Sequence, residues 1–473
     1  MAAPQPEFAW LSLLVKSVEE VDEYRTETRG PWPAELRGTL YRNGPGLFER
    51  NGVGKRSLGD GDGMIRAYRI GDGQVSFRSR FIRTTKFREE EAAGRYLYPT
   101  WSTRAPGGWL RNIGRRRRSQ AEENVIFHRG KLLAFDEVGL PWALDPETLE
   151  TVSRYQVGAP GDWPTFLTHS KKDPFNGEWT VVGSDYHRPE RMRIVVENRN
   201  GEVVSDRRVR APRPSYVHDF FATPLYLVFN INALRMKPLK ALLGLEHVAG
   251  ALHWQPEMGN VAFVVPKDGS APFGLPAPAV WSVHTVNAYE VGEEIVCDFI
   301  GLDNPDYLFD KDGAFSAIMR DIVRTDAPAG RVHRWRIDTA AKTVAPEILD
   351  DHSYELPTVD PLRLGLPYRH AYLAAMRPGQ WWPSGIARLD VQTGRREFYE
   401  GRRTQVFGEP LFVPRQGGGT DEGWVLAEAL DGRERTTTLH LFDAGRVSAG
   451  PIAEATLRQP MPTSFHGCWV DQP

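Results

Sequence analysis

Short runs of alternating apolar and polar residues, separated by Gly, Asn and Asp, recur along much of the chain. In residues 64–77 two such runs flank Gly71-Asp72-Gly73, and residues 193–205 repeat the arrangement around Asn200-Gly201. Asn-Gly and Asp-Gly pairs tolerate the positive φ values that a tight hairpin turn requires. The pattern therefore predicts antiparallel hairpins and a chain dominated by β-strands.

A weaker internal repeat indicates how these hairpins are arranged. A strand that ends in aspartate, followed by a turn and a second strand, occurs at Ala143-Leu144-Asp145, Arg336-Ile337-Asp338 and Arg388-Leu389-Asp390. The last two aspartates are 52 residues apart, near the ~40–50-residue spacing of propeller blades. A β-propeller is the favoured architecture. Ordinary hairpins in a sandwich or in two β domains are the alternative.

Helical patterns are few. The best segment is residues 233–245, an insertion of apolar and basic residues between predicted strands. No low-complexity linker divides the 473 residues, and large closed β folds can absorb such a length. We therefore expect one domain over residues 1–473. The 41% hydrophobic and 25% charged residues are typical of a folded globular protein.

Charge and cysteine content narrow the classes of function. A net charge of −2, from 59 basic and 61 acidic residues, gives no global field that would attract nucleic acid. The two cysteines, Cys297 and Cys468, are too few for a disulfide framework and indicate a reducing compartment, for which we expect the cytoplasm. No stretch approaches the ~20 apolar residues needed to cross a bilayer. No obligate protein partner is predicted.

Four of the twelve histidines lie in apolar or aromatic stretches predicted to be strands: His169, His218, His284 and His466. A lone histidine is more often a packed or solvated side chain than a ligand. Separations of 49, 66 and 182 residues exclude a local metal motif such as His-Glu-x-x-His. If the four imidazoles form one site, the fold must bring them together from distant blades.

Sequence words along most of the chain match one known family. They begin with Gly38-Thr-Leu-Tyr-Arg-Asn-Gly-Pro-Gly46 and Asp60-Gly-Asp-Gly-Met64, and then include Lys131-Leu-Leu-Ala-Phe-Asp-Glu137. All four histidine words follow, together with Asn287-Ala-Tyr-Glu290, Gly408-Glu-Pro-Leu-Phe-Val-Pro-Arg415 and the terminal Phe465-His-Gly467. With these words the chain resembles the carotenoid cleavage oxygenases from about Gly38 to the C-terminus.

The resemblance implies an all-β fold, a seven-bladed β-propeller with loops and short helices that form a cap over an iron-bearing face. It implies Fe(II) bound by His169, His218, His284 and His466. It also places three glutamates, Glu137, Glu355 and Glu409, as acceptors behind three of the imidazoles, where each fixes a ring and its tautomer. Four neutral imidazoles suit Fe(II) and leave two positions of an octahedron open.

The reaction implied by the resemblance is the oxidative cleavage of an alkene. Dioxygen adds across a double bond of a conjugated chain, and two carbonyl products leave without a reductant. Because a polyene offers few polar groups, the protein must supply an apolar tunnel that places it by shape and dispersion contacts. The residues of that tunnel are not predicted.

Two departures from the family pattern bear on the iron site. Family members usually carry an Asn-Thr pair where this chain has Glu122-Glu123, and the threonine is thought to crowd an open iron position. A carboxylate at Glu123 is therefore expected to perturb that position. Cys468 follows His466 by two residues and could face the same way in a strand. Soft thiolate ligation would lower the Lewis acidity of the iron, so it is disfavoured.

The substrate is predicted from a comparison of branches. The stilbene-cleaving branch is similar too, but its phenol-binding tyrosine and lysine correspond here to Trp101 and Asp136, which cannot ionise a phenol in the same way. Residues 40–46 and 106–110 look more like the apocarotenoid-cleaving branch. An apocarotenoid is therefore favoured. The alternatives are a stilbene or phenylpropenoid alkene, a retinoid-type isomerisation without dioxygen, a zinc hydrolase and a non-catalytic propeller.

Two stretches mix apolar side chains with cations, Trp109–Arg118 and Leu234–Leu245. Apolar insertion combined with basic contacts to anionic lipid is how peripheral enzymes bind membranes. These stretches predict peripheral membrane contact. The alternative is a solvated arginine loop and an ordinary packed helix.

Overall fold

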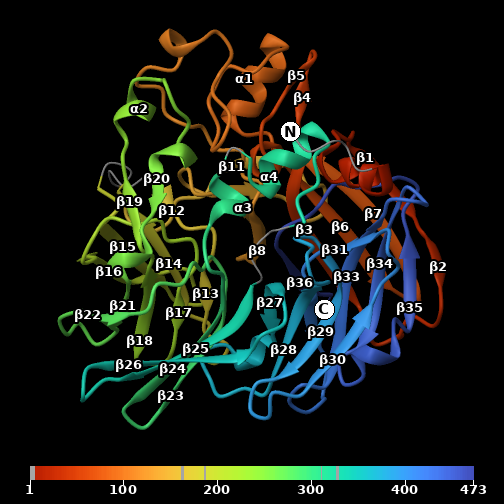
Figure 1. Ribbon diagram of the computed structural model, residues 1–473. Coiled ribbons are helices and arrows are strands. Elements are labelled where there is room, and N and C mark those ends of the chain that lie inside the picture. The colour runs from red at the N-terminus through yellow and green to blue at the C-terminus, as the bar shows by residue number, and fades with distance from the viewer. Residues whose placement is uncertain (1–5, 161–164, 186–187, 311, 326–329, 473) are drawn as a thin grey trace.

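Seven antiparallel β-sheets follow one another around a central axis and form a β-propeller (Figure 1). The computed structural model describes residues 6–160, 165–185, 188–310, 312–325 and 330–472. Within these residues each of the seven sheets has at least four strands. The all-β fold predicted from the hairpins, and the seven blades implied by the resemblance, are confirmed.

The first four blades are named in chain order. Blade 1 contains β36 (Gly467–Asp471), β3 (Gly38–Leu47), β6 (Asp62–Gly71), β7 (Gln74–Phe81) and β1 (Val21–Arg25). Blade 2 contains β8 (Asn124–His128), β9 (Lys131–Phe135), β10 (Trp142–Leu144) and β11 (Thr151–Arg154). Blade 3 contains β12 (Thr165–Phe166), β13 (Lys171–Lys172), β14 (Trp179–Ser184), β15 (Arg191–Glu197) and β16 (Val203–Arg210). Blade 4 contains β17 (Phe221–Ala222), β18 (Tyr226–Ile231), β21 (Asn260–Pro266) and β22 (Phe273–Ala277).

Three further blades complete the ring. Blade 5 contains β23 (Thr285–Val291), β24 (Glu294–Gly301), β25 (Arg331–Asp338) and β26 (Thr343–Asp350). Blade 6 contains β27 (Tyr354–Val359), β28 (His370–Met376), β29 (Pro383–Asp390) and β30 (Arg396–Glu400). Blade 7 contains β31 (Gln405–Phe407), β32 (Leu411–Pro414), β33 (Gly423–Asp431), β34 (Thr436–Asp443), β35 (Ala453–Thr456) and β2 (Glu27–Arg29). Separate two-stranded sheets are formed by β4 (Glu49–Arg50) with β5 (Val53–Gly54), and by β19 (Leu234–Met236) with β20 (Leu252–Trp254).

Both ends of the chain close the ring. The last strand, β36, pairs with β3 in blade 1, with Leu40 opposite Trp469. The early strand β2 pairs with β35 in blade 7, with Thr28 opposite Ala455. Because blades 1 and 7 both combine early and late segments, the ring can close only when the whole chain is folded.

The turn chemistry read from the sequence is present in the structure. At the β6–β7 hairpin Asp72 and Gly73 have φ values of 51° and 71°, as expected for a tight turn that needs two left-handed residues. The three repeated aspartates lie at or just after the end of a strand and accept backbone N–H groups of the following turn with Oδ1: Asp145 before β11, Asp338 before β26 and Asp390 before β30. The repeat is therefore the outer hairpin of three blades.

Apolar side chains from neighbouring blades share each layer of the core. Val75 and Phe77 of β7, for example, belong to one buried cluster with Leu439 and Leu441 of β34. Strands toward the outside of a blade alternate in burial: β7 between buried and partly buried positions, and β16 between partly buried and exposed positions. Alternating patterns in the sequence thus correspond to strands that bury only one of their faces against the adjacent blade.

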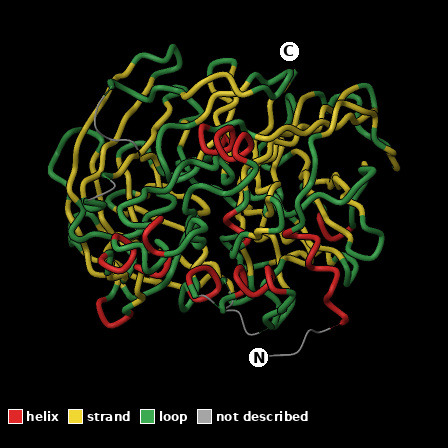
Figure 2. The backbone as a smooth tube through the Cα atoms, turned by 90° about the horizontal axis from the view of Figure 1, so that it is seen from above, coloured by secondary structure: helices red, strands yellow, loops and turns green. Residues whose placement is uncertain are grey.

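Most helices gather on one side of the strands and form the predicted cap (Figure 2). The α-helices are α1 (Thr85–Ala93), α2 (Leu239–Leu242), α3 (Asp306–Phe309) and α4 (Ala314–Ala317). The 3-10 helices are η1 (Pro6–Val15), η2 (Leu58–Asp60), η3 (Trp109–Arg111), η4 (Ala249–Ala251), η5 (Pro256–Met258), η6 (Ile318–Arg320), η7 (Pro361–Arg363) and η8 (Val447–Ala449). Among the described residues, no helix is long and apolar enough to span a membrane.

The helix expected over residues 233–245 is largely wrong. Its first part forms strand β19, and only the single turn α2 is helical after Pro238. Proline has no backbone N–H and disfavours helix for the residue before it, so a helix can start at this proline but not cross it. The longest α-helix, α1, was not predicted, although Thr84 caps its start and Gly94 ends it with a positive φ.

Candidate metal centre

Four histidines from four blades meet near the centre of the ring. His169 follows β12, and the other three lie just before the inner strands β17, β23 and β36: His218, His284 and His466. One ring nitrogen from each lies within 4.8 Å of the others, and Nε2 of His284 is 3.1 Å from Nε2 of His466. The four imidazoles singled out in the sequence therefore form one cluster.

The other three blades place carboxylates near the same centre. Glu123 comes just before β8, Glu355 lies in β27, and Glu409 follows β31. Thus every one of the seven blades contributes at least one side chain of the histidine and glutamate set, near the inner end of its sheet. The cluster is a product of the propeller, in which every blade brings its inner strand to the axis.

Three glutamates hold three of the imidazoles at Nδ1. Glu137, which follows β9, lies 2.7 Å from Nδ1 of His218. The corresponding distances are 2.5 Å from Glu355 to His284 and 2.8 Å from Glu409 to His466. A carboxylate that accepts the Nδ1 proton leaves the Nε2 lone pair free for a metal.

Two of these glutamates are themselves held in place, Glu355 by the local backbone and Glu409 by a side chain. Glu355 lies where the pairing of β27 with β28 shifts register, and Leu356 beside it has a φ of 51°. This strained position re-aims a side chain of the inner strand, and the Leu356 N–H donates to the Glu355 carboxylate. Glu409 is held from behind by Arg42, whose guanidinium lies 2.5 Å from its Oε2.

The electrostatics of the imidazoles suit a cation. Burial, followed by the neighbouring imidazoles, lowers the pKa of His169 well below its usual value, and Nε2 of His169 is buried without a hydrogen-bond partner. Burial also lowers the pKa of His466 to about 4. Burial alone would lower the pKa values of His218 and His284, but the Glu137 and Glu355 carboxylates raise them. Converging imidazoles with an orphaned nitrogen fit a divalent metal with nitrogen ligands.

Glu123 lies at the edge of this cluster. Its carboxylate accepts a hydrogen bond from the Thr168 hydroxyl and lies with Glu137 and His218 in a second group of potential ligands within 4.8 Å of one another. Burial and the Glu137 charge raise the pKa of Glu123 to about 8. The neighbouring Glu122 is also buried. The group of four histidines does not include Glu123.

Three other residues were considered from the sequence as substrate-binding or metal-ligand positions. Trp101 lines the pocket beside the histidines, whereas the Asp136 carboxylate accepts the backbone N–H groups of Gln120, Ala121 and Val138. Cys468 is not part of the four-histidine group, and burial raises the pKa of its thiol to about 12. A thiolate ligand at Cys468 is not supported by this geometry.

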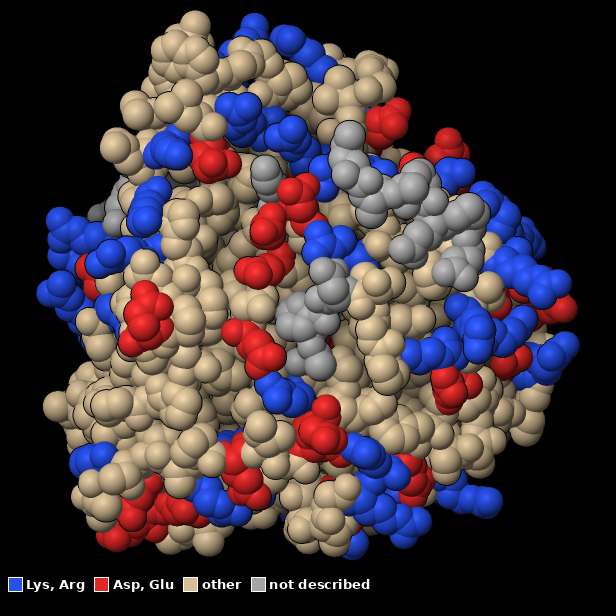
Figure 3. All heavy atoms as spheres, viewed as in Figure 1, with Lys and Arg blue, Asp and Glu red and all other residues tan. Residues whose placement is uncertain are grey.

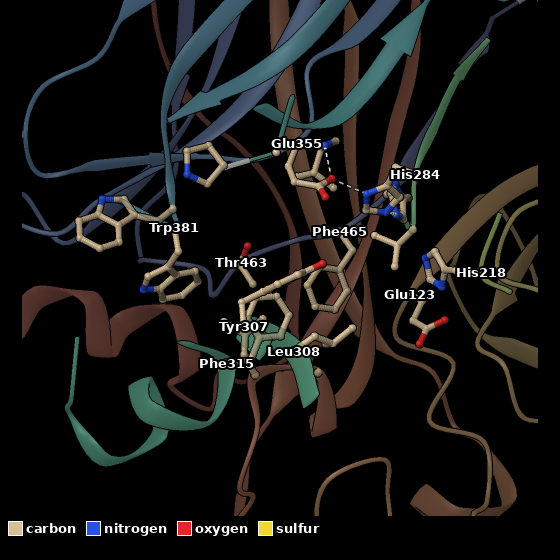
Figure 4. Close-up of a pocket in the computed structure, with 18 of the residues that line it drawn as sticks. Glu123, His218, His284, Tyr307, Leu308, Phe315, Glu355, Trp381, Thr463 and Phe465 are labelled. Atoms are coloured by element: carbon tan, nitrogen blue, oxygen red, sulfur yellow. Dashed lines mark hydrogen bonds and ion pairs between the residues drawn. The ribbon is translucent and has the colours of Figure 1, made fainter. Parts of the chain in front are cut away.

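An aromatic pocket adjoins the histidines (Figure 4). It encloses about 1340 Å³ including its open mouth, and the cap, blade 6 and the segment before β36 supply most of its wall. Apolar members of the lining include Leu58, Val283, Leu308, Phe315, Trp381 and Phe465. None of these was identified from the sequence, because the wall is assembled from segments that meet only in the folded ring.

Comparison with known proteins agrees with this geometry. Residues 15–471 match the family described as RPE65, retinal pigment epithelial membrane protein. The chain belongs to this family of carotenoid oxygenases. Its oxygenase relatives include the apocarotenoid-15,15'-oxygenase of Synechocystis, 30% identical over 98% of this chain and 96% of the relative. The isoeugenol monooxygenase of Pseudomonas nitroreducens is 28% identical over 96% of both chains.

Solved structures of carotenoid oxygenases share the fold closely. A mutant of the Synechocystis apocarotenoid oxygenase superposes with a TM-score of 0.92, at 28% identity and with full coverage of both chains. The cobalt-substituted form of that enzyme also gives 0.92, at 29% identity over 98% of each chain. The chain is therefore an oxygenase of the carotenoid-cleavage type, in a family of non-haem iron enzymes that use dioxygen. The alternative of a propeller that only binds a partner, without catalysis, is therefore set aside.

Proposed function

We propose that this carotenoid oxygenase cleaves a carbon–carbon double bond of an apocarotenoid, with Fe(II) held by His169, His218, His284 and His466. One observation carries the proposal: four imidazoles that are mostly shielded from solvent, one with an orphaned nitrogen, converge beside an aromatic pocket. Iron bound there supplies the one-electron chemistry that dioxygen needs to react with a closed-shell alkene. Both oxygen atoms then reside in two carbonyl products, so no reductant is consumed.

The protein residues bind, orient and exclude water. Glu137, Glu355 and Glu409 keep the Nδ1 protons of three imidazoles in place, so that each ring, once it has lost its second proton, can bind a metal through Nε2. The apolar pocket wall holds a polyene by shape and excludes water from the reacting carbons. Such a cleavage transfers no proton, so the site needs no general base.

The position of Asp136 favours an apocarotenoid over a phenolic alkene. Its carboxylate is satisfied by three backbone N–H groups, so it is not available to bind or ionise a phenol. Two relatives are named after phenolic alkenes, isoeugenol monooxygenase and resveratrol cleavage oxygenase. The experiment therefore compares apocarotenoids with phenolic alkenes as substrates.

Mass spectrometry of the products tests the proposed reaction. The Fe(II)-loaded protein is incubated under ¹⁸O₂ with a small panel of apocarotenals and stilbenes. We expect pairs of carbonyl products from an apocarotenal, each with a label from dioxygen, and oxygen uptake in step with product. Products from stilbenes alone would contradict the proposed substrate. Isomers formed without oxygen uptake would contradict the proposed reaction. Activity with Zn(II) in place of Fe(II) would indicate a hydrolase.

Glu123 is proposed to perturb the open side of the metal centre. Its carboxylate lies beside His218 but outside the four-histidine set, so it borders the site without replacing an imidazole. The Co(II)-loaded protein offers a readout that does not depend on catalysis, since visible Co(II) bands report coordination. Glu123→Thr is expected to change these bands, and Glu347→Thr on the exposed strand β26 is the control. Identical spectra would show that Glu123 does not influence the metal.

We also propose peripheral contact with a membrane, at the cytoplasmic side. The two predicted stretches lie together at the tip of the cap, where the Gly114 N–H donates to the Leu242 carbonyl. Four leucine and tryptophan side chains there are about half exposed or more: Trp109 (49%), Leu110 (70%), Leu239 (68%) and Leu242 (53%). Figure 3 shows this upper end of the face as mostly uncharged surface bordered by Lys and Arg. Such a patch fits an anionic lipid surface.

Flotation with vesicles tests the membrane proposal. Vesicles of anionic phospholipid should carry the wild-type protein, and Leu110→Ser combined with Leu239→Ser should reduce the bound fraction. Val203→Ser combined with Val204→Ser removes exposed apolar side chains from the outer strand β16 and serves as the control. Equal flotation of both double variants would contradict a specific role for the cap.

A further inference from the structure

Tyr307 is a polar side chain within the apolar part of the pocket. It belongs to α3 in the cap, and its ring packs perpendicular to Phe315 at a centroid distance of 5.6 Å. In Figure 4 it extends across the pocket with its hydroxyl directed toward Phe465 and the side where His284 and Glu355 lie. Its position therefore brings a phenol hydroxyl into the space that a substrate must fill.

The hydroxyl of Tyr307 has a proton to donate. Burial, and then the charge of Glu355, raises the pKa of Tyr307, so the phenol stays protonated. The indole N–H of Trp281 lowers this pKa, by a smaller amount. Because an indole N–H can only donate a hydrogen bond, Trp281 cannot accept the phenol proton. Among the described residues, no hydrogen bond from the Tyr307 hydroxyl to an acceptor is found. By contrast Tyr216, the other pocket tyrosine, lies 3.1 Å from Nδ1 of His218.

A donor in such surroundings discriminates between ligands. The neighbouring wall consists of side chains such as Leu308, Phe315 and Phe465, which offer nothing to a polar atom. An oxygen atom that leaves water for this wall costs free energy unless it finds a donor. A truncated polyene that ends in a carbonyl brings one strong acceptor into the pocket, whereas a hydrocarbon polyene brings none.

We propose that Tyr307 is a specificity-determining residue, whose hydroxyl donates to the carbonyl oxygen of the polyene substrate. This inference rests on the proposed function, because it assigns the class of substrate for the same pocket. Tyr307 thereby favours a polyene that ends in an aldehyde over a hydrocarbon polyene of the same length. It binds and orients the substrate and takes no proton away, so no bond to hydrogen is broken.

Equilibrium binding to the metal-free protein tests this inference without catalysis. The probes are an apocarotenal and the polyene of equal length that ends in a methyl group, and the readout is quenching of the pocket tryptophans. Tyr307→Phe should raise the Kd for the aldehyde roughly 3- to 10-fold, as expected for one neutral hydrogen bond, and leave the Kd for the hydrocarbon unchanged. Tyr289→Phe, which alters a tyrosine of β23 outside the pocket lining, is the matched control and should change neither value.

Two results would overturn the inference. Equal weakening of both ligands would show that Tyr307 only shapes the pocket, and an unchanged Kd for the aldehyde would show that its oxygen lies elsewhere. Kinetics of the Fe(II)-loaded enzyme form a second arm, in which Tyr307→Phe should raise KM for the aldehyde more than it lowers kcat. If the aldehyde binds with the expected dependence on Tyr307 but the wild-type enzyme does not cleave it, the proposed function fails while the binding role of Tyr307 stands.

Discussion

The four-histidine centre and the ion cluster beneath helix α1 are both buried, but only the ion cluster contains the charges that balance it. Lys86 lies 2.5 Å from Asp62 and 2.9 Å from Glu90, and all three side chains are at most 1% exposed. Lys55 lies nearby, with its ammonium group 3.9 Å from the centre of the Tyr96 ring. Cations and carboxylates thus satisfy one another, and this closed cluster fastens the cap helix α1 to β6 of blade 1.

The histidine centre lacks such a balance. Two Nε2 atoms face each other at 3.1 Å and a third, on His169, has no partner. The glutamates act on the Nδ1 side, away from the convergence of the rings. A buried polar group without a partner is costly, so this open cluster gains stability from an added cation. Polar atoms without a partner therefore distinguish the ligand site from the ion cluster, although both contain buried polar residues.

Removing one imidazole should have the largest effect, because it removes a metal ligand itself. His284→Ala is predicted to abolish iron retention, measured as the ratio of iron to protein after gel filtration. His333→Ala, a histidine of β25 packed against Phe299, is the control and should keep its iron. An unchanged ratio in His284→Ala would show that the centre does not depend on its imidazoles to hold iron.

Removing the central cation of the closed cluster should affect stability, not metal content. Lys86→Met leaves Asp62 and Glu90 buried and without their main partner, which is expected to cost about 3–5 kcal/mol. Urea denaturation should show this loss in the free energy of unfolding. Replacement of Arg69, which pairs with Glu147 at an exposed site, should cost at most about 1 kcal/mol. A small effect of Lys86→Met would mean that Lys55 or water takes over the pairing.

Much of the propeller could be predicted from the chain because its signals are local. Asp72-Gly73 and Asn200-Gly201 mark hairpins through their backbone preferences, and the aspartates before β11, β26 and β30 fix outer turns by bonds to residues two or three positions ahead. Each of these interactions lies within a few residues. The four histidines stood out by their apolar and aromatic surroundings, but the number of blades and the role of the histidines as ligands of one iron came from the resemblance to the carotenoid cleavage oxygenases.

Features that depend on distant contacts could not be predicted. The pocket wall joins Leu58, Tyr307, Phe315 and Trp381, which no spacing rule relates. The position of Glu355 depends on a register shift in β27 that has no sequence signature. Helix α1 is different, because its Thr84 and Gly94 caps are visible in the sequence. Its short and highly charged body lacks the apolar periodicity on which helix prediction relies.

The pH dependence of stability reports the protonation of Lys55 in the closed cluster. Burial and the nearby Lys86 lower the pKa of Lys55 from 10.5 to about 8. Between these values the unfolded chain keeps the proton that folded Lys55 has lost, so the contribution of Lys55 to the free energy of unfolding rises with pH. The rise is at most about 3 kcal/mol over the window from pH 8 to 10.5.

Denaturation curves of the wild-type protein and Lys55→Met at pH 7.5, 9 and 10 measure this rise. Groups that titrate in both proteins cancel in the difference between them. The wild-type protein should gain stability relative to the variant as the pH increases. A constant difference would show that Lys55 keeps its proton in the folded state over this pH range. Lys55 would then remain a cation of the cluster.

A smaller effect on the metal centre is predicted for a residue that supports a ligand without being one. Glu355→Ala removes the acceptor that orients His284 but leaves all four imidazoles, so metal affinity should fall about 10- to 100-fold and not vanish. Competition with a chelator measures the affinity for Co(II), and Glu347→Ala on β26 is the control. A loss as complete as that of His284→Ala would mean that Glu355 binds the metal directly. No loss at all would mean that packing alone orients the ring, and the glutamates would then be part of the fold rather than of the centre.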